Sequence, residues 1–250
     1  MPISLLRVYR ILLEHYGPQG WWPVARHAGE PGFDENGYHP NIWRIPKTEE
    51  DRWEILTGAI LTQNTSWKNV ELALVALRAE GISAASDVLS LTESKLASLI
   101  RPSGYYNQKA KRLRSFAAWL NARPNPADPP ARKELLSLVG IGPETADSML
   151  LYAWNQPVFV VDLYTIRLLT RLSIVSTEEI PMQPIRRYEH VQKSILSRLS
   201  RSPVSSQERL RLYTEMHALI VRHAKEHCAA RPKCAQCPLG RYCPSQSPSP

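Results

Sequence analysis

Four cysteines near the C-terminus constrain this chain more than any other feature. All the cysteines of the 250-residue sequence lie in one short window with the spacing C-x5-C-x2-C-x5-C, as Cys228, Cys234, Cys237 and Cys243. Four thiolates in so short a loop can enclose a zinc ion or an iron–sulfur cluster without help from the rest of the chain. Two disulfides or idle thiols are the alternative, but clustered cysteines in an intracellular protein more often bind metal. We therefore predict a metal or cluster site here.

Composition indicates a globular protein with an anionic partner. The chain has 43% hydrophobic residues, enough for a core at this length, and 31 Lys plus Arg against 23 Asp plus Glu give a net charge of +8. Such an excess favours nucleic acid or another polyanion as partner, although a solvated basic surface gives the same number.

We expect an intracellular protein. The apolar N-terminal segment is interrupted by Arg7 and Arg10, so it is neither a membrane helix, which needs roughly 20 apolar residues, nor a signal peptide. A cytoplasmic monomer without a membrane partner is predicted, associated with the nucleoid if the source is bacterial.

Apolar residues recur with helical spacing along most of the sequence, which predicts an all-α fold. A polar stretch over residues 26–47 is typical of an irregular loop, and Val158 to Val161 is a β-branched run that could form one short strand. The expected helices cover Leu5 to Tyr16, Trp53 to Leu61, Ser66 to Leu77, Lys133 to Val139, Pro143 to Trp154, Asp162 to Leu172, Ile185 to Leu199 and Gln207 to His227.

Gly140-Ile141-Gly142 joins two of these helices, and Pro143 follows at the first position of the second helix. Two glycines allow a tight hairpin, and proline suits a first helical turn. The hairpin amides and the helix N-terminus could hold a DNA phosphate without reading base sequence. A plain turn between helices is the alternative.

These motifs together resemble a known family. Leu138 to Ala146 is similar to the helix-hairpin-helix of the endonuclease III superfamily of DNA glycosylases, and Val160 to Arg167 is similar to its VDTHIxR segment. Leu61 to Thr65 and Gly104 to Ala110 resemble two further segments, and the four-cysteine loop completes the order.

The resemblance implies a helix-hairpin-helix glycosylase fold, with a six-helix barrel domain and an iron–sulfur cluster domain. We expect the barrel over residues 48–158, with the helix-hairpin-helix at about 134–153, and the cluster domain over 1–47 plus 159–244. A disordered tail is expected over 245–250, and the active site in the cleft between the domains.

The resemblance also implies catalytic roles. The family's catalytic aspartate matches Asp162, whose carboxylate would stabilise an oxocarbenium-like sugar and orient water; alone, Asp162 could equally be an N-cap. Members that also cut the DNA backbone carry a lysine 18 positions before this aspartate, where this chain has Glu144. A carboxylate forms no Schiff base, so base removal without strand cleavage is expected, unless another lysine such as Lys109 substitutes.

The substrate prediction depends on a narrower likeness. The segments Tyr16 to Pro23, Leu61 to Val70 and Glu144 to Asp147 look most like the 3-methyladenine glycosylase branch. Trp21, Trp22 and Trp53 would then stack on a flipped, positively charged alkylated purine. Each tryptophan could instead belong to the core.

Double-stranded DNA containing damaged bases is the implied partner. Gln63 matches the residue that fills the gap left by the flipped nucleotide, and Tyr105 matches the wedge in the opposite strand, where leucine is usual. Further DNA contacts are expected from Lys109, Gly140, Ile141, Gly142 and Thr145.

A [4Fe-4S] cluster on the four cysteines is the implied cofactor, with zinc as the alternative. The first interval is one residue shorter than the family's usual one, and His227, next to Cys228, has the family's distance from Cys234. Two other functions stay open: a bifunctional glycosylase and AP lyase acting on oxidised pyrimidines, and a non-enzymatic iron–sulfur protein that binds DNA.

Overall fold

Side-chain caps fix where several helices begin. Thr48 and Asp51 form a reciprocal capping box at the first turn of α2 (Glu49–Leu61), and Ser205 and Glu208 form another on α11 (Ser206–Glu226). Gly17, with φ of 70°, ends α1 (Leu5–Tyr16). This computed structural model describes residues 3–176, 178–200 and 205–245, so most of the predicted tail lies outside the described residues.

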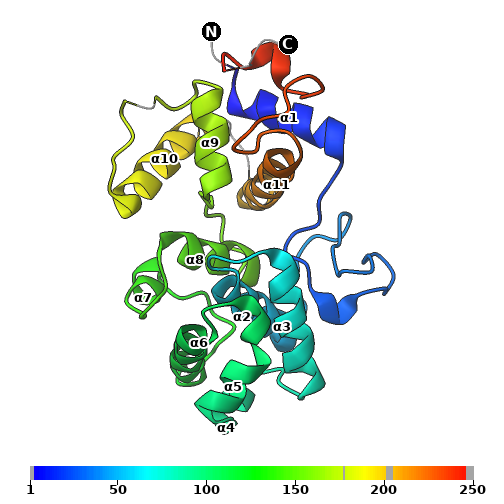
Figure 1. Cartoon of the computed structure of the whole chain (residues 1–250), viewed down its shortest axis with the longest axis vertical. Helices are drawn as coiled ribbons and strands as arrows, with labels where there is room; N and C mark the ends of the chain where they lie inside the picture. The colour runs from blue at the N-terminus through cyan, green and yellow to red at the C-terminus, as the bar shows by residue number, and fades with distance from the viewer. Residues whose placement is uncertain (1–2, 177, 201–204, 246–250) are drawn as a thin grey trace. The chain divides into compact units, whose positions relative to one another are not determined.

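The chain divides into two units, residues 1–21 with 157–250 and residues 22–156 (Figure 1). The remaining helices are α3 (Trp67–Ala79), α4 (Ala85–Ser90), α5 (Glu93–Leu99), α6 (Tyr106–Asn121), α7 (Arg132–Leu136), α8 (Pro143–Ser148), α9 (Leu163–Arg171) and α10 (Pro184–Leu199), with short turns of helix at η1 (Ala25–His27), η2 (Arg101–Ser103), η3 (Met149–Ala153) and η4 (Gly240–Tyr242). The all-α prediction is confirmed in the part of the chain that the structure describes, where residues 158–161 form no strand.

Helix α2 is the core of the unit formed by residues 22–156. It packs against α3, α6, α8 and η3, while α4 and α5 lie on α6. Its apolar side chains are buried all round the helix, with Ile55, Leu56, Ile60 and Leu61 each 0% exposed. Every residue of α2 from Trp53 to Leu61 is buried, including the polar Glu54 and Thr57, because other helices surround this stretch.

Residues 22–47 belong to the same unit as α2, because polar contacts attach them to that helix. The Ala25 amide donates to Glu54 at 2.6 Å, and the Lys47 amide donates to Asp51 at 2.9 Å. Composition could not reveal these contacts in a loop that lacks periodicity.

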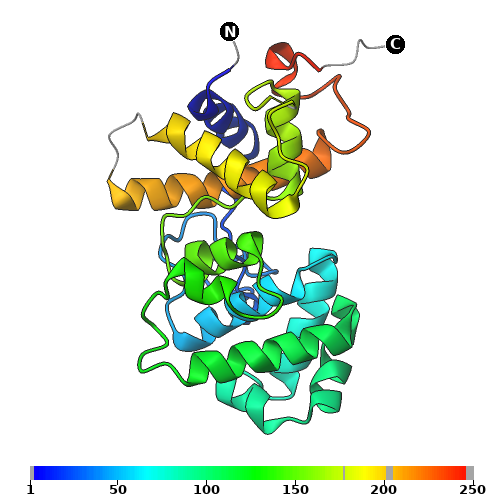
Figure 2. The same cartoon turned by 90° about the vertical axis from the view of Figure 1, so that its left-hand side faces the viewer.

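The second unit contains α1, α9, α10, α11 and the cysteine loop. Helix α11 packs against α1 and α9, and α10 packs against α1 (Figure 2). Val8, Leu12, Leu169 and Leu219 are each fully buried among these helices. No helix among the described residues is long and apolar enough to cross a membrane.

Candidate active site

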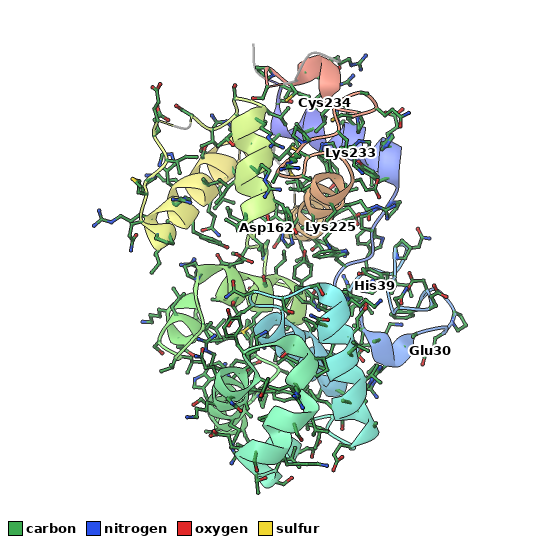
Figure 3. The ribbon with its side chains drawn as sticks, viewed as in Figure 1. Glu30, His39, Asp162, Lys225, Lys233 and Cys234 are labelled. Carbon is green, nitrogen blue, oxygen red and sulfur yellow. The ribbon has the colours of Figure 1, made fainter. Side chains whose placement is uncertain are left out.

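Asp162 occupies the N-cap of α9 (Figure 3). Its Oδ1 accepts a hydrogen bond from the Thr165 backbone amide at 2.7 Å. The residue is 9% exposed. Asp162 is therefore an N-cap, as one interpretation of the sequence predicted, but the cap uses only one of its two carboxylate oxygens.

The second oxygen faces a histidine. His217 on α11 places Nε2 3.7 Å from Asp162 Oδ2, and both side chains are nearly enclosed. Burial by itself would raise the pKa of Asp162, but the neighbouring His217 and the Thr165 amide outweigh it and hold that pKa below its usual range. Asp162 is thus a buried carboxylate kept ionised at neutral pH.

Trp21 contacts the same histidine. Its ring meets the His217 ring edge to face, with centroids 5.6 Å apart. Motif comparison does not single out His217, because a histidine on the buried face of a long helix is usually a core residue. The sequence signal that could have found it is weak: its helical spacing from the buried Tyr213 and Ile220 places it on the same face of α11.

The hairpin between α7 and α8 forms as predicted at Gly140. This glycine has φ of +82°, and a Cβ there would lie 2.4 Å from side-chain atoms of Arg112. Arg132 on α7 and Asp147 on α8 fasten the two helices through a bidentate ion pair, with N···O distances of 2.6 and 3.1 Å. Val139 at the tip is 80% exposed.

Gln63 lies on this hairpin from the end of α2. Its Nε2 donates to Gly140 O at 2.9 Å and to Thr145 Oγ1 at 3.0 Å, and its Oε1 accepts from Arg112 at 2.7 Å. The structure thus brings together three of the predicted DNA-contacting residues, Gln63, Gly140 and Thr145. Ile141 and Thr145 are buried, so contacts at this place would come from backbone groups and from exposed Gly142.

Two other predicted DNA contacts differ sharply in exposure. Tyr105 is 67% exposed at the N-cap of α6, with φ of 48° in the left-handed region. Lys109, by contrast, is 1% exposed and donates from Nζ to the carbonyls of Leu61 at 2.7 Å and Ser103 at 2.6 Å. The expectation that Lys109 contacts a phosphate is therefore corrected, because its ammonium is used inside the fold.

The predicted base-pocket tryptophans have separate partners. Trp22, 6% exposed, packs its ring against Trp67 and Tyr152, with centroids 5.2 Å away in each case. Trp53, 5% exposed, lines a cavity of about 320 Å³ between α2 and α3. The stacking role of the three tryptophans stays a prediction, and Trp21 is less buried than the other two.

Glu144 occupies the position where the lyase lysine would stand. It lies in the first turn of α8 and is exposed, and its carbonyl accepts from the Ser148 hydroxyl at 2.7 Å. An acidic side chain there interacts favourably with the helix N-terminus. The amine of Lys109, the other lysine considered for this role, is buried and bonded to backbone carbonyls, so it offers no nucleophile at the surface.

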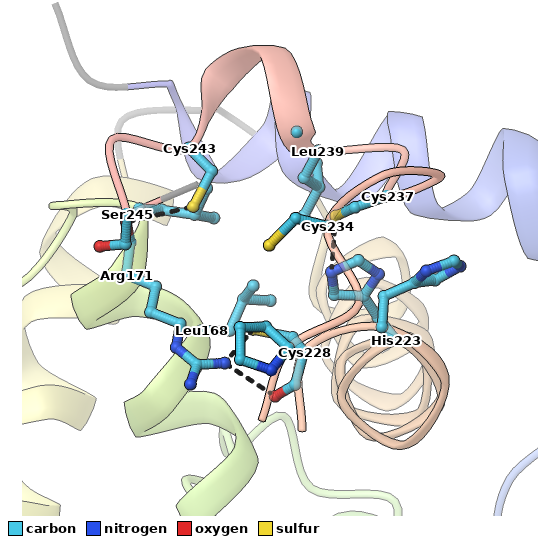
Figure 4. A pocket seen from close by; sticks show the side chains of 13 residues that line it. Leu168, Arg171, His223, Cys228, Cys234, Cys237, Leu239, Cys243 and Ser245 are labelled. Atoms are coloured by element: carbon cyan, nitrogen blue, oxygen red, sulfur yellow. Dashed lines mark hydrogen bonds between the residues drawn. The ribbon is translucent and has the colours of Figure 1, made fainter. Parts of the chain in front are cut away.

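The four cysteines line one pocket together with Arg171, His223 and Leu239 (Figure 4). All four are free thiols. Burial first, and then the neighbouring Cys228, Cys243 and Cys234, raise the pKa of the Cys237 thiol. Among the described residues, no group of three or more His, Cys, Asp or Glu side chains is arranged to hold a single metal ion.

The donor set of this pocket suits a cluster of iron and sulfide. Four soft sulfur ligands converge from one short loop, and Cys234 and Cys243 turn their sulfur atoms toward the middle of the pocket. Arg171 Nη1 donates to Cys228 Sγ at 3.2 Å, a contact that stabilises a thiolate. His227 also lines the pocket, beside Cys228. The residues present therefore fit the expected cofactor.

Three comparisons place this geometry in a known group. The family model of the HhH-GPD superfamily of base excision DNA repair proteins matches residues 57–193. A Methanocaldococcus jannaschii protein that carries the name DNA repair glycosylase is 36% identical, over 97% of this chain and 96% of its own length.

Solved structures agree. The 3-methyladenine DNA glycosylase of H. pylori, bound to 1,N6-ethenoadenine, is 27% identical, with a TM-score of 0.60 over 90% of this chain and 98% of its own. A non-covalent endonuclease III–DNA complex, 21% identical, shares the fold with a TM-score of 0.68 over 98% of this chain and 97% of its own. The family match covers more than half of the chain and includes the hairpin and Asp162, so this protein is a member of the HhH-GPD superfamily of base excision DNA repair glycosylases.

Proposed function

We propose that the protein removes alkylated purines from double-stranded DNA by hydrolysing their N-glycosidic bond, without cutting the backbone. The observation that carries the proposal is Asp162, a carboxylate kept ionised with one oxygen fixed by the helix cap. As the bond breaks, its electrons leave with the base and positive charge develops on the sugar. An anion near that charge stabilises the transition state and orients the water that replaces the base.

Alkylated purines are the proposed substrate class for two reasons. A methylated purine is cationic and already a good leaving group, so a site with one carboxylate can release it without a separate general acid. The match to the H. pylori 3-methyladenine DNA glycosylase spans 98% of that protein's length. Trp21, half-buried beside His217, is our proposed stacking surface for the base.

Glu144 supports base removal without strand cleavage. Backbone cleavage by β-elimination needs an amine that can form a Schiff base with the sugar, and a carboxylate cannot do this. Lys109 is not a substitute in the described conformation, because it is buried.

A [4Fe-4S] cluster held by the four cysteines is part of the proposal. When bound, the cluster supplies a rigid support for the loop, and no redox chemistry is needed for base hydrolysis. This chain's own residues link the loop to α9, because Arg171, in the last turn of that helix, donates to the carbonyls of Cys228 at 3.2 Å and Ala229 at 2.7 Å.

A panel of duplexes, each with one damaged base, tests the function. Free base and strand breaks are scored separately for 3-methyladenine, 7-methylguanine, 1,N6-ethenoadenine, oxidised pyrimidines and undamaged DNA. We expect free alkylated purine without strand breaks. Release of oxidised pyrimidines with strand scission would favour the bifunctional alternative, and DNA binding without any base release would favour the non-enzymatic one.

Borohydride trapping tests the role of Glu144. The native chain should give no covalent protein–DNA adduct, whereas Glu144→Lys places an amine at the family's lysine position and should form one. A trapped adduct with the native chain would contradict the monofunctional proposal. Glu144→Gln is the control, because it removes the charge without adding an amine.

A further inference from the structure

The second carboxylate oxygen of Asp162 has a specific neighbour that base removal alone does not explain. Oδ1 is used by the cap of α9, where it accepts from the Thr165 amide at 2.7 Å. Oδ2 is turned to the other side and lies 3.7 Å from His217 Nε2. A carboxylate fixed at one oxygen can still change its rotation, so the group beside the other oxygen decides its orientation.

His217 is itself held in place. Only 6% of its side chain is exposed, and the Trp21 ring stands perpendicular to it at 89°. The loop that carries Trp21 is attached to the same helix two residues away, since the Gln19 amide donates to Glu215 Oε1 at 2.5 Å. Glu215 is 1% exposed. The histidine therefore has little freedom to leave the carboxylate.

The other titratable groups near Asp162 point elsewhere. On α11, the Glu215 carboxylate is bonded to the Gln19 amide, and burial raises its pKa to about 7. On α10, the Tyr188 hydroxyl accepts from the Val161 amide at 3.3 Å, one residue before Asp162. On α9 itself the contact is the Thr165 amide. His217 is the side chain that the structure places beside the second oxygen of the carboxylate.

We propose that His217 is a positioning residue, which orients the second oxygen of Asp162 and keeps the carboxylate ionised for base removal. The proposal rests on the catalytic role proposed for Asp162 and adds a residue that acts through it. Nε2 can donate toward Oδ2 in the charged and in one neutral form of the ring. Without it, the carboxylate would lose its orientation and burial would favour the neutral acid, which cannot stabilise a cationic sugar.

Two variants and a control test this inference. His217→Leu fills the space without a donor, and His217→Asn restores an amide donor. His190→Leu, on α10 of the same unit, is the matched control. Single-turnover base release is measured from pH 4 to pH 8 at saturating protein, on the duplex best cleaved in the damage panel. Affinity for the same duplex is measured in parallel.

The expected result is a loss in the chemical step alone. His217→Leu should slow base release about 10- to 100-fold, because a carboxylate that loses its fixed orientation is misplaced relative to the reacting sugar, and Kd should be unchanged. The pH at which the rate of base release falls on the acid side should be higher for this variant, since Asp162 loses the contact that lowers its pKa. His217→Asn should recover part of the rate, and His190→Leu should behave as the native chain.

A measurement without substrate gives an independent readout. Titration of the Asp162 carboxyl by carbon NMR should show a raised pKa in His217→Leu. If His217→Leu does not fold, His217→Phe, which also lacks a donor, takes its place. A native rate with an unchanged Asp162 pKa in that variant overturns the inference, and a slower rate with a raised pKa supports it.

The outcomes separate this inference from the proposed function. If Asp162→Asn releases base as fast as the native chain, the catalytic role fails and this inference fails with it. If Asp162→Asn is inactive while His217→Leu keeps the native rate, acid limb and Asp162 pKa, the inference is overturned and the proposed function stands. A change in Kd alone would also overturn it.

Discussion

Tyr105 and Lys109 lie four residues apart in the unit of residues 22–156, but one side chain is exposed and the other is buried. Tyr105 holds a left-handed backbone conformation while its ring is exposed, and strain of this kind in a residue other than glycine is often kept for function. Lys109, four residues later, has its ammonium inside the fold. The sequence resemblance predicted that both side chains contact DNA, because it depends on residue type and order and contains no information on the direction of a side chain.

Tyr105→Gly should raise stability and lower activity. Glycine adopts φ of 48° without strain, so the free energy of unfolding should rise by about 1 kcal/mol. Base release should fall because the exposed ring is lost. Denaturant unfolding and single-turnover kinetics check the two effects, and Tyr105→Phe is the control that keeps the ring. A Tyr105→Gly variant with native activity would contradict a role for the side chain in DNA.

Lys109 predicts a pH dependence of stability. Burial lowers its pKa to about 8 in the folded chain, against an ordinary value of 10.5. Between these pH values the unfolded chain binds more protons, so this group makes stability rise with pH. Lys109→Met has no titrating amine at this position. Between these two pH values, the free energy of unfolding of the native chain should therefore rise by on the order of 2–3 kcal/mol relative to that of the variant. Unfolding curves that run parallel from pH 8 to pH 10.5 would contradict this assignment.

At the scale of elements, the helices that periodicity predicts are present, and their ends differ by a few residues. The predicted helix from Pro143 to Trp154 is correct in place but changes character after Ser148, where η3 is a turn of π-helix. Met149 to Ala153 are all buried. Because every position there is apolar, periodicity could not show that the winding changes.

The hairpin offers a matched pair of glycines. Gly140→Ala places a Cβ at φ of +82° and against Arg112, whereas Gly142 has φ of −93° and open space where a Cβ would be added. Gly140→Ala should therefore lower the free energy of unfolding by roughly 1–2 kcal/mol or more, and Gly142→Ala should lower it by much less. Thermal unfolding of the two variants checks this, and equal losses would contradict the geometry.

The sequence could predict only those parts of the candidate site that belong to contiguous motifs. The hairpin and Asp162 are such parts, so residue type and order were enough to select them. Two contacts between distant residues could not be predicted. His217 is 55 positions after Asp162, and only the packing of α11 on α9 brings them together. Gln63, Arg112 and Gly140 likewise meet only after the barrel helices have folded.

At the scale of the whole molecule, the cysteine loop is tied to the helix that carries Asp162. Arg171 connects the last turn of α9 to Cys228 and Ala229. Loss of the proposed cluster should therefore reduce stability, although the cysteines have no role in the chemical step. The net charge of +8 is consistent with a polyanion as partner, although the hairpin from which we expect phosphate contacts contains no charged residue from Gly140 to Gly142.

Cys234→Ser tests the cofactor. The native protein should contain four iron and four sulfide per chain, as the proposed [4Fe-4S] cluster requires, and should show broad visible absorption. The variant should lose both, together with thermal stability. Metal analysis distinguishes the alternatives: a colourless native protein with about one zinc per chain would contradict the cluster and favour zinc.

The most direct test of the catalytic role is base release by Asp162→Asn. Asparagine keeps the size of the side chain and can still accept from the Thr165 amide, so the fold and the affinity for damaged duplex should stay near those of the native chain. Because the amide is neutral, it cannot balance the developing charge on the sugar, and single-turnover release of alkylated purine should fall at least about 1,000-fold, which corresponds to roughly 4 kcal/mol. Release at the native rate, by a variant that binds DNA normally, would contradict the central claim.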